Sequence, residues 1–336
     1  LPPTLETKVE GGTWILPSEM VKIGEEEMRK QGKDPEVDRI DIRPDKGTAK
    51  VTFKTHFTEV QVDGFSGGDR LNTNLPATQT ALMKELKKLG KPMVLVLLNG
   101  SAISVNWEQE NISSIVEAWY PGQECGNAIA DVLFGHAEPG GRLPQTFPKH
   151  LSDNSAMTGD PKTYPGENGH VVYTEGLAVG YRHHDADGAK PLFPFGYGLS
   201  YTRFEWSTPR ASGTDIGPDG VTFEVEVRNI GDRAGAELVQ LYVAPKVSRL
   251  PRPVKELKSF AKLPILAGGT ALAELSISIR DLAYFDPEER AWIAEAGDYD
   301  LIIAANAEDI RATLPLTLST EWREGVSAPP LPAVVF

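Results

Sequence analysis

The segment that decides the fold is Lys91–Trp107, which reads KPMVLVLLNGSAISVNW. Its apolar run, Met93–Leu98, lies between a Lys-Pro pair and an Asn-Gly pair. A short apolar run bounded by turn residues is typical of a strand that is buried on both faces, as in a parallel sheet. Ile115–Tyr120 is a second run of this kind. The two runs therefore predict neighbouring strands of one sheet.

Helical patterns lie on both sides of these runs. Pro76 opens a predicted helix that Gly90 ends, and a second predicted helix covers Cys125–Phe134 before Gly135. Strands that alternate with helices at this spacing predict a mostly parallel sheet flanked by helices, and we assign this α/β domain to residues 49–206. The apolar stripe of the first helix consists of Leu82, Leu86 and Leu89.

The chain before this domain is harder to interpret, and residues 1–48 are a segment of uncertain assignment. A strand is predicted at Trp14–Leu16, and a helix from Ser18 to Gln31. Lys50–Phe53 and Glu59–Val62 alternate polar and apolar residues, as half-buried strands do.

After residue 207 the hydrophobic period changes to two. Short alternating strands with no helix between them predict an all-β sandwich, which we assign to residues 207–325, with a tail at 326–336. The apolar positions are Val221, Phe223, Val225 and Val227, then Val239, Leu241 and Val243, then Leu272, Leu275, Ile277 and Ile279, then Tyr299, Leu301 and Ile303.

The composition excludes several classes of partner. A formal net charge of -13 over 336 residues repels phosphate backbones and anionic membrane faces, so we expect neither nucleic acid nor a membrane as partner. The single cysteine, Cys125, cannot form an internal disulfide, so the fold depends on its hydrophobic cores. The chain begins at Leu1, and we interpret it as a processed or excised piece of a secreted or periplasmic protein.

Long motifs in the chain resemble glycoside hydrolase family 3. They are Lys91–Trp107; Glu117–Pro148, which reads EAWYPGQECGNAIADVLFGHAEPGGRLPQTFP; Tyr173–Gly176; Gly180–Arg182; and Leu192–Trp206, which reads LFPFGYGLSYTRFEW. The sandwich is similar to the family's fibronectin type III-like domain, at Pro253–Phe260 and Ala296–Tyr299. The resemblance implies the carboxy-terminal α/β domain of the family followed by that sandwich.

The resemblance also implies an activity. Family members hydrolyse terminal β-linked sugars with retention, and this chemistry uses two carboxyl groups about 5–5.5 Å apart and no metal or cofactor. The family's nucleophile lies on an amino-terminal barrel, which takes about 250 residues and has no room in this chain. We therefore expect part of an exo-acting β-glucosidase whose barrel comes from a missing segment or another chain. The expected partners of this chain also include β-linked glucosides or oligosaccharides. A second copy of the chain, in a homodimer, is a further possible partner.

The acid/base glutamate that the resemblance implies has no secure counterpart. It stands five residues before the valine of Val62-Asp63-Gly64 in relatives that share this landmark, and Phe57 occupies that place. A compressed loop would place it at Ser66. Glu59 is the nearest carboxylate and our candidate, with a solvent-facing strand residue as the alternative. A non-catalytic carbohydrate-binding or scaffold fragment is the rival function.

The remaining polar candidates have two interpretations each. Asp69 and Arg70 either bind sugar hydroxyls or form a local ion pair that holds the glycine-rich loop Asp63–Arg70. His183 and His184, with Asp185 and Asp187, suggest a metal, but neighbours on a strand face opposite sides, so we expect a surface turn. We expect core packing rather than sugar stacking of the tryptophans Trp107, Trp119 and Trp206.

Overall fold

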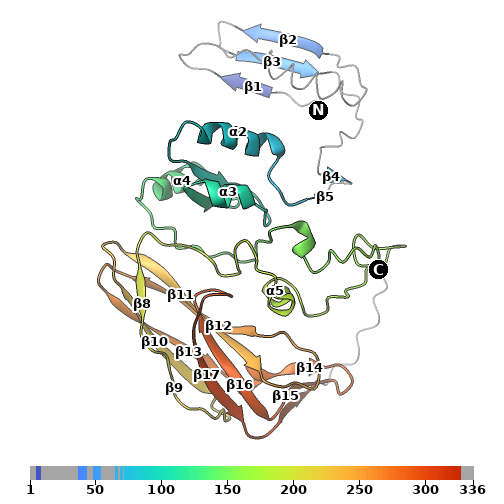
Figure 1. Ribbon diagram of the computed structural model, residues 1–336, viewed down its shortest axis with the longest axis vertical. Coiled ribbons are helices and arrows are strands. Elements are labelled where there is room, and N and C mark those ends of the chain that lie inside the picture. The colour runs from blue at the N-terminus through green and yellow to red at the C-terminus, as the bar shows by residue number, and fades with distance from the viewer. Residues whose placement is uncertain are drawn as a thin grey trace. The chain divides into compact units, whose positions relative to one another are not determined.

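The computed structural model divides the chain into two compact units, Leu1–Leu71 and Asn72–Phe336 (Figure 1). It describes residues 72–326 in full. In the first unit it describes the backbone of residues 5–8, 37–43, 48–53, 65–66 and 69–70. The predicted boundaries at residues 48, 206 and 325 remain predictions.

The first unit contains an antiparallel sheet of order β1-β3-β2 and a short hairpin, β4-β5. The strands are β1 (Leu5–Lys8), β2 (Val37–Arg43), β3 (Thr48–Phe53), β4 (Phe65–Ser66) and β5 (Asp69–Arg70). The strand predicted at Lys50–Phe53 lies within β3, whereas the glycine-rich stretch predicted as a loop contains the β4-β5 hairpin. The elements predicted at Trp14–Leu16, Ser18–Gln31 and Glu59–Val62 lie outside the described residues.

The α/β part contains the two strands that the opening segment predicts. β6 (Val94–Leu97) and β7 (Ser114–Glu117) pair in parallel, with Val94 opposite Ser114 and Leu97 opposite Glu117. The helices α2, α3 and α4 lie close to this pair in Figure 1. They cover Ala77–Lys87, Asn106–Asn111 and Cys125–Leu133. The fold class is thus confirmed, although both strands are shorter than the apolar runs that predicted them.

The predicted apolar stripe of α2 is not buried. Leu82, Leu86 and Leu89 are all exposed, and no residue of α2 is buried within the described part of the chain. A pair of four-residue strands offers too little apolar surface to cover a helix of three turns. The core of this part is formed instead by Leu97, Ile103, Val105 and Phe147.

The long irregular segment that follows α4 packs against the same core, through Phe147 and Phe193. The Phe147 ring meets the Trp119 ring edge-on, with centroids 5.8 Å apart, and the Phe193 ring at 6.1 Å. Phe147 and Phe193 also form a backbone bridge. The segment therefore returns to the α/β part before it enters the sandwich.

The sandwich has two four-stranded sheets and a smaller third sheet. The first sheet contains β13 (Thr270–Ile277), β10 (Val221–Asn229), β8 (Phe204–Trp206) and β9 (Arg210–Ala211). The second has the order β12 (Glu256–Ile265), β11 (Gly235–Pro245), β16 (Gly297–Ala304) and β17 (Ile310–Leu318). The third contains β14 (Tyr284–Asp286), β15 (Ala291–Ala294) and β18 (Trp322–Gly325). Within residues 72–326, 3-10 turns lie at Leu151–Asp153, ahead of the sandwich, and at Ile279–Leu282.

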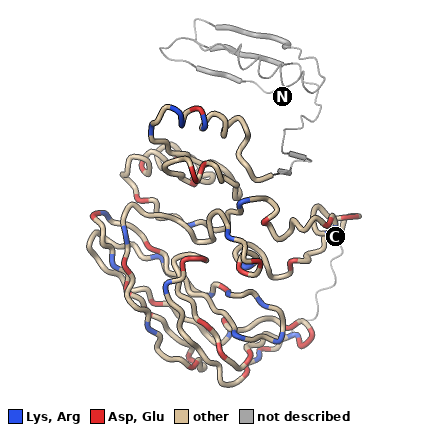
Figure 2. The backbone as a smooth tube through the Cα atoms, viewed as in Figure 1, with Lys and Arg blue, Asp and Glu red and all other residues tan. Residues whose placement is uncertain are grey.

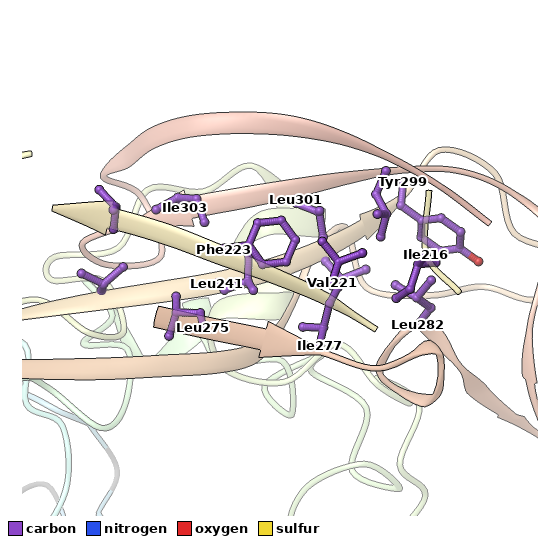
Figure 3. Packing of buried hydrophobic residues seen from close by; sticks show 14 of the residues in the cluster. Ile216, Val221, Phe223, Leu241, Leu275, Ile277, Leu282, Tyr299, Leu301 and Ile303 are labelled. Atoms are coloured by element: carbon purple, nitrogen blue, oxygen red, sulfur yellow. The ribbon is translucent and has the colours of Figure 1, made fainter. Parts of the chain in front are cut away.

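Alternating side chains of the two large sheets meet to form the main core (Figure 3). Phe223 from β10 packs with Leu241, Leu301 and Ile303 from the facing sheet, as the period of two predicts. Leu272 is a correction, because it is exposed. Strand residues three positions apart face opposite sides, so Leu272 cannot share the inward face of Leu275.

Tyr181–Asp187 forms the helix α5, so the turn predicted at His183 and His184 is wrong. Gly180, with a φ of 61°, and Gly188, with a φ of 72°, lie at its two ends. The left-handed region of φ is one that glycine adopts without strain. The glycines therefore let the chain enter and leave a helix of two turns that propensity alone would not predict.

A buried cluster joins α5 to the sandwich, and we call it the α5 contact: Tyr181, Asp185, Tyr242 and Lys255. Lys255 is 4% exposed, and its ammonium pairs with the Asp185 carboxylate and lies 5.9 Å and 5.6 Å from the Tyr181 and Tyr242 ring centroids. The Tyr181 hydroxyl accepts a 2.9 Å hydrogen bond from the amide of Leu257. Helix and sandwich are therefore held together by a buried ion pair within aromatic rings.

Candidate functional site

A candidate site lies at the carboxyl ends of β6 and β7. Ligands of open α/β sheets bind beyond the carboxyl ends of parallel strands, where the loops diverge. The amide of Ala118 still donates to the Leu97 carbonyl at 2.9 Å, which keeps the two strand exits side by side. The chain then continues through Asn99 after β6 and through Trp119 after β7.

Glu117, the last residue of β7, accepts two hydrogen bonds at this edge. Its Oε1 accepts from the amide of Trp119 at 3.0 Å, and its Oε2 accepts from Asn99 Nδ2 at 3.2 Å. Burial of the carboxyl group raises the pKa of Glu117, and the two hydrogen bonds offset that rise in part. The side chain thus connects the two strand exits.

Asn99 contributes an unpaired acceptor. The side chain is 7% exposed, and its Nδ2 also donates to the Ser101 carbonyl at 2.9 Å. Its Oδ1 is buried without a hydrogen-bond partner among the described residues. Buried polar atoms in native proteins nearly always have a partner, so this oxygen marks a place where a donor is missing.

The turn after β7 has an unusual backbone. Trp119 has a φ of 54°, a left-handed conformation that costs a bulky residue free energy. The next ring, Tyr120, is 76% exposed and lies over Gly100, where a Cβ would stand only 2.6 Å from the Tyr120 ring. A Cβ at position 100 would displace the exposed Tyr120 ring, and the hydrogen bond that the Trp119 amide donates to Glu117 helps to hold the strained turn.

The predicted roles of the tryptophans are clear for two of them. Trp119 packs against the α/β core and Trp206 against the sandwich core, which confirms core packing for both. Trp107 is half-buried, and the ammonium groups of Lys84 and Lys87 lie 5.4 Å and 5.8 Å from its ring centroid.

The predicted site residues of the first unit are not tested. Glu59 and Phe57 lie outside the described residues. Asp69 and Arg70 form β5, in which Asp69 pairs with Ser66. Their roles toward a sugar stay predictions.

The histidine pair of α5 does not assemble a metal site in the described part of the chain. Asp185 is paired with Lys255, and His184 Nδ1 lies 2.8 Å from the Ala189 carbonyl. Among residues 72–326, no three side chains of His, Cys, Asp or Glu are placed to share an ion.

The described helices are also too short and polar to cross a bilayer.

Sequence reasoning missed Asn99 and Glu117 as functional candidates. A signal was present, because Asn99 directly follows the first apolar run and Glu117 is the one charged residue within the second. Their side chains lie side by side only because the strands run parallel and in register.

Substitution of Glu117 by Gln should remove part of the pH dependence of stability. The folded-state pKa lies above the ordinary value of 4.5, so the native state binds this proton more tightly than the unfolded state. The wild type should therefore lose stability relative to Glu117→Gln as pH rises from about 4 through the raised pKa. At pH 7 Glu117→Gln should still be about 1 kcal/mol less stable than the wild type. One of the two N–H groups that donate to Glu117 would face the side-chain nitrogen of glutamine, which cannot accept a hydrogen bond.

Urea unfolding of both proteins between pH 4 and pH 7 measures this difference. The exposed Glu85→Gln on α2 is the control and should track the wild type. A wild-type advantage that is constant or grows with pH would contradict the assignment.

An α/β domain with a polar carboxyl edge, followed at once by a fibronectin type III-like sandwich, is the carboxy-terminal architecture of a class of glycoside hydrolases. The model of the glycosyl hydrolase family 3 C-terminal domain matches residues 26–201, and that of the fibronectin type III-like domain matches residues 237–307. The chain belongs to glycosyl hydrolase family 3.

Two similar relatives are named β-glucosidases. The chain is 52% identical over 255 residues to a β-glucosidase of Rhizobium radiobacter, covering 76% of this chain and 31% of that protein. It is 41% identical over 262 residues to β-glucosidase BoGH3A of Bacteroides ovatus, covering 78% and 34%. The chain thus spans about a third of the length of the relatives it matches.

Solved structures agree with this placement. The Kluyveromyces marxianus β-glucosidase superposes with a TM-score of 0.70 at 36% identity, covering 76% of this chain and 30% of that one. The Bifidobacterium adolescentis family 3 β-glucosidase gives 0.71 at 37% identity, covering 81% and 39%. The predicted family and fold are therefore confirmed.

Proposed function

We propose that this chain is the α/β and sandwich part of a retaining, exo-acting β-glucosidase that releases terminal β-D-glucosyl residues from oligosaccharides or glucosides. The observation that carries the proposal is the 52% identity to a β-glucosidase over three quarters of the chain. The match includes the segment that forms β6, β7 and the Asn99–Glu117 edge.

The proposed reaction divides its two carboxyl groups between domains. A carboxylate of a barrel domain attacks the anomeric carbon, while a carboxylic acid of the α/β domain protonates the leaving oxygen and then activates water. Glu59 is our candidate for the second group, and Asp69 and Arg70 are candidates to bind sugar hydroxyls. The names of the two β-glucosidase relatives support glucose over xylose as the released sugar.

The 336-residue chain alone should not hydrolyse a nitrophenyl β-glucoside above the background rate. Hydrolysis with retention needs two opposed carboxyl groups, and we expect the chain to supply one. The release of nitrophenol by the purified chain measures this. Turnover at the rate of an ordinary enzyme, roughly 1 per second or more, would contradict it.

Glu59→Gln should lower kcat about 10²–10⁴-fold in an enzyme completed with the unmatched amino-terminal part of the Rhizobium radiobacter protein. Loss of general acid–base catalysis should also flatten one limb of the pH–rate profile. Glu85→Gln, at an exposed position of α2, is the control. An unchanged kcat and pH profile would remove Glu59 from the mechanism.

A second candidate function is carbohydrate binding without catalysis, which the phenylalanine at position 57 favours. Calorimetry with glucose and cellobiose distinguishes the two. Saturable binding by the completed protein without hydrolysis supports the second candidate. We further propose that the protein acts in carbohydrate metabolism and is secreted or periplasmic. Cell fractionation tests the location, and sedimentation tests whether the protein forms a homodimer.

A further inference from the structure

On the basis of the function proposed above, we propose that the Tyr120 ring is a stacking platform for the leaving group of the substrate. The leaving group is the sugar or aryl ring from which the terminal glucosyl residue is removed. Tyr120 lies on the loop after β7, at the edge where the chain leaves the two parallel strands. Loops at this edge are where open α/β sheets bind their ligands.

The Tyr120 side chain is presented to solvent. It is 76% exposed, whereas the residue before it, Trp119, packs against the α/β core. An aromatic side chain can bury about 150–250 Å² of surface, and most of that surface is open here. The ring is therefore available to pack against the ring of a ligand.

The backbone that turns this side chain outward is strained. Trp119 has a φ of 54°, in the left-handed region that is unfavourable for a bulky residue. Strained backbone persists only where the surrounding structure fixes it, and such positions gather at binding and active sites. The strain therefore points to a constraint on the direction of the next side chain.

One hydrogen-bond network holds both loops of the site. The amide of Trp119 donates to Glu117 at 3.0 Å, and Asn99 Nδ2 donates to the same carboxylate at 3.2 Å. Asn99 Nδ2 also donates to the Ser101 carbonyl at 2.9 Å, a bond that spans Gly100. A site that is ordered before binding loses less conformational entropy when a ligand arrives.

Gly100 makes room for the ring. A Cβ at this position would stand 2.6 Å from Cε2 and 3.1 Å from the hydroxyl oxygen of Tyr120. One edge of the ring thus lies directly over the glycine, on the loop that Asn99 holds. The ring has a support on one side and remains open to solvent over most of its surface.

The surroundings of the ring suit an uncharged ligand. Residues 99–105 and 118–123 contain no charged side chain, and basic and acidic residues are interspersed over the rest of the described unit (Figure 2). Ser101 and Gln123 are exposed polar residues on the same two loops. An aromatic surface beside uncharged polar groups matches a sugar, which has C–H groups on its faces and hydroxyl groups at its rim.

The leaving group fits this platform better than the terminal glucose does. In the proposed reaction the terminal sugar lies between two carboxyl groups and must be held closely, so that its anomeric carbon stays aligned with them. The leaving group differs between oligosaccharides and glucosides. An open aromatic surface accepts rings of different structure, because stacking needs only a flat apolar surface.

The test compares substrates in the enzyme completed with the unmatched amino-terminal part of the Rhizobium radiobacter protein. Tyr120→Ala should raise KM for cellobiose and for a nitrophenyl β-glucoside by about three- to tenfold. KM for methyl β-glucoside, which has no second ring, should not change. The kcat values should stay near the wild type, because stacking acts equally on the bound substrate and the transition state. Tyr120→Phe keeps the ring and should behave as the wild type.

Two further variants separate the position of the ring from general effects of substitution. Gly100→Ala displaces the ring without removing it, so it should raise the KM values of the two substrates that have a second ring. Phe134→Ala is the matched control, because this equally exposed aromatic residue follows the far end of α4. It should leave all three KM values unchanged.

Calorimetry with thiocellobiose, whose sulfur linkage resists hydrolysis, measures binding without catalysis. Tyr120→Ala should weaken this binding by the same factor. Unchanged KM values, unchanged thiocellobiose binding, or an equal rise of KM for methyl β-glucoside would each overturn the stacking role. A completed enzyme that hydrolyses no glucoside, but binds thiocellobiose more weakly after Tyr120→Ala, would support the platform and count against the proposed function alone.

Discussion

Lys255→Met should lower the free energy of unfolding by about 3–5 kcal/mol, because it leaves the Asp185 carboxylate buried without its partner. Lys255 and Asp185 are both largely buried, and Asp185 Oδ2 already lacks a hydrogen-bond partner in the described residues. The Tyr181 and Tyr242 rings flank the ammonium, and the Asp185 side chain is only 15% exposed, so solvent replaces the lost ammonium only in part. Urea unfolding followed by circular dichroism measures the change.

Two further variants separate a buried charge from lost packing. Lys255→Met combined with Asp185→Leu should recover most of the lost stability, since a buried ion pair replaced by apolar groups of similar volume is often neutral. Lys246→Met is the matched control, because the Lys246–Asp300 pair is much more exposed and should contribute less than about 1 kcal/mol. Equal losses in Lys255→Met and Lys246→Met would contradict the role of the α5 contact.

Phe223→Ala should destabilise the sandwich by about 3–5 kcal/mol, since it removes a fully buried ring and leaves a cavity between two sheets. The ring lies between β10 and the facing sheet, against Leu241 and Leu301 (Figure 3). Rigid strands on both sides limit how far the surroundings can relax into the space. Urea unfolding monitored by tryptophan fluorescence measures the loss.

Phe260→Ala is the control for this prediction. Phe260 is 66% exposed on β12, so its truncation should change stability by less than about 0.5 kcal/mol. Both variants remove the same atoms, which leaves burial as the difference between them. Similar losses for the two would mean that the core is not where the alternation places it.

Local patterns were reliable where one period governs a whole strand. Phe223, Val239 and Leu301 are inward because side chains alternate along a strand, whatever lies across from them. Leu272 was placed wrongly because the buried phase of β13 is Ala273, Leu275 and Ile277, and Leu272 lies on the opposite face. α5 was missed because its histidines and aspartates are weak helix formers, and the contact of Tyr181 and Asp185 with the sandwich stabilises it.

The candidate site was less accessible to prediction. The glutamate that the family resemblance implies has no match at Phe57, and Glu59 remains a prediction. Asn99 and Glu117 are visible in the sequence as polar residues next to apolar ones. No local pattern indicates, however, that an amide and a carboxylate 18 residues apart share a hydrogen bond. The strained turn at Trp119 has no sequence signature either, since left-handed backbone is associated with glycine and asparagine.

The sequence by itself determined the two parallel strands, the helices α2 and α4 and most of the alternating faces of the sandwich, because each of these depends on residues within a few positions of one another, whereas α3 was not predicted. The tertiary structure alone decided that Asn99 meets Glu117 and that Lys255 meets an aspartate 70 residues earlier. The reason is physical. Periodicity specifies which way a side chain points from its own strand or helix, whereas its partner depends on how whole elements pack.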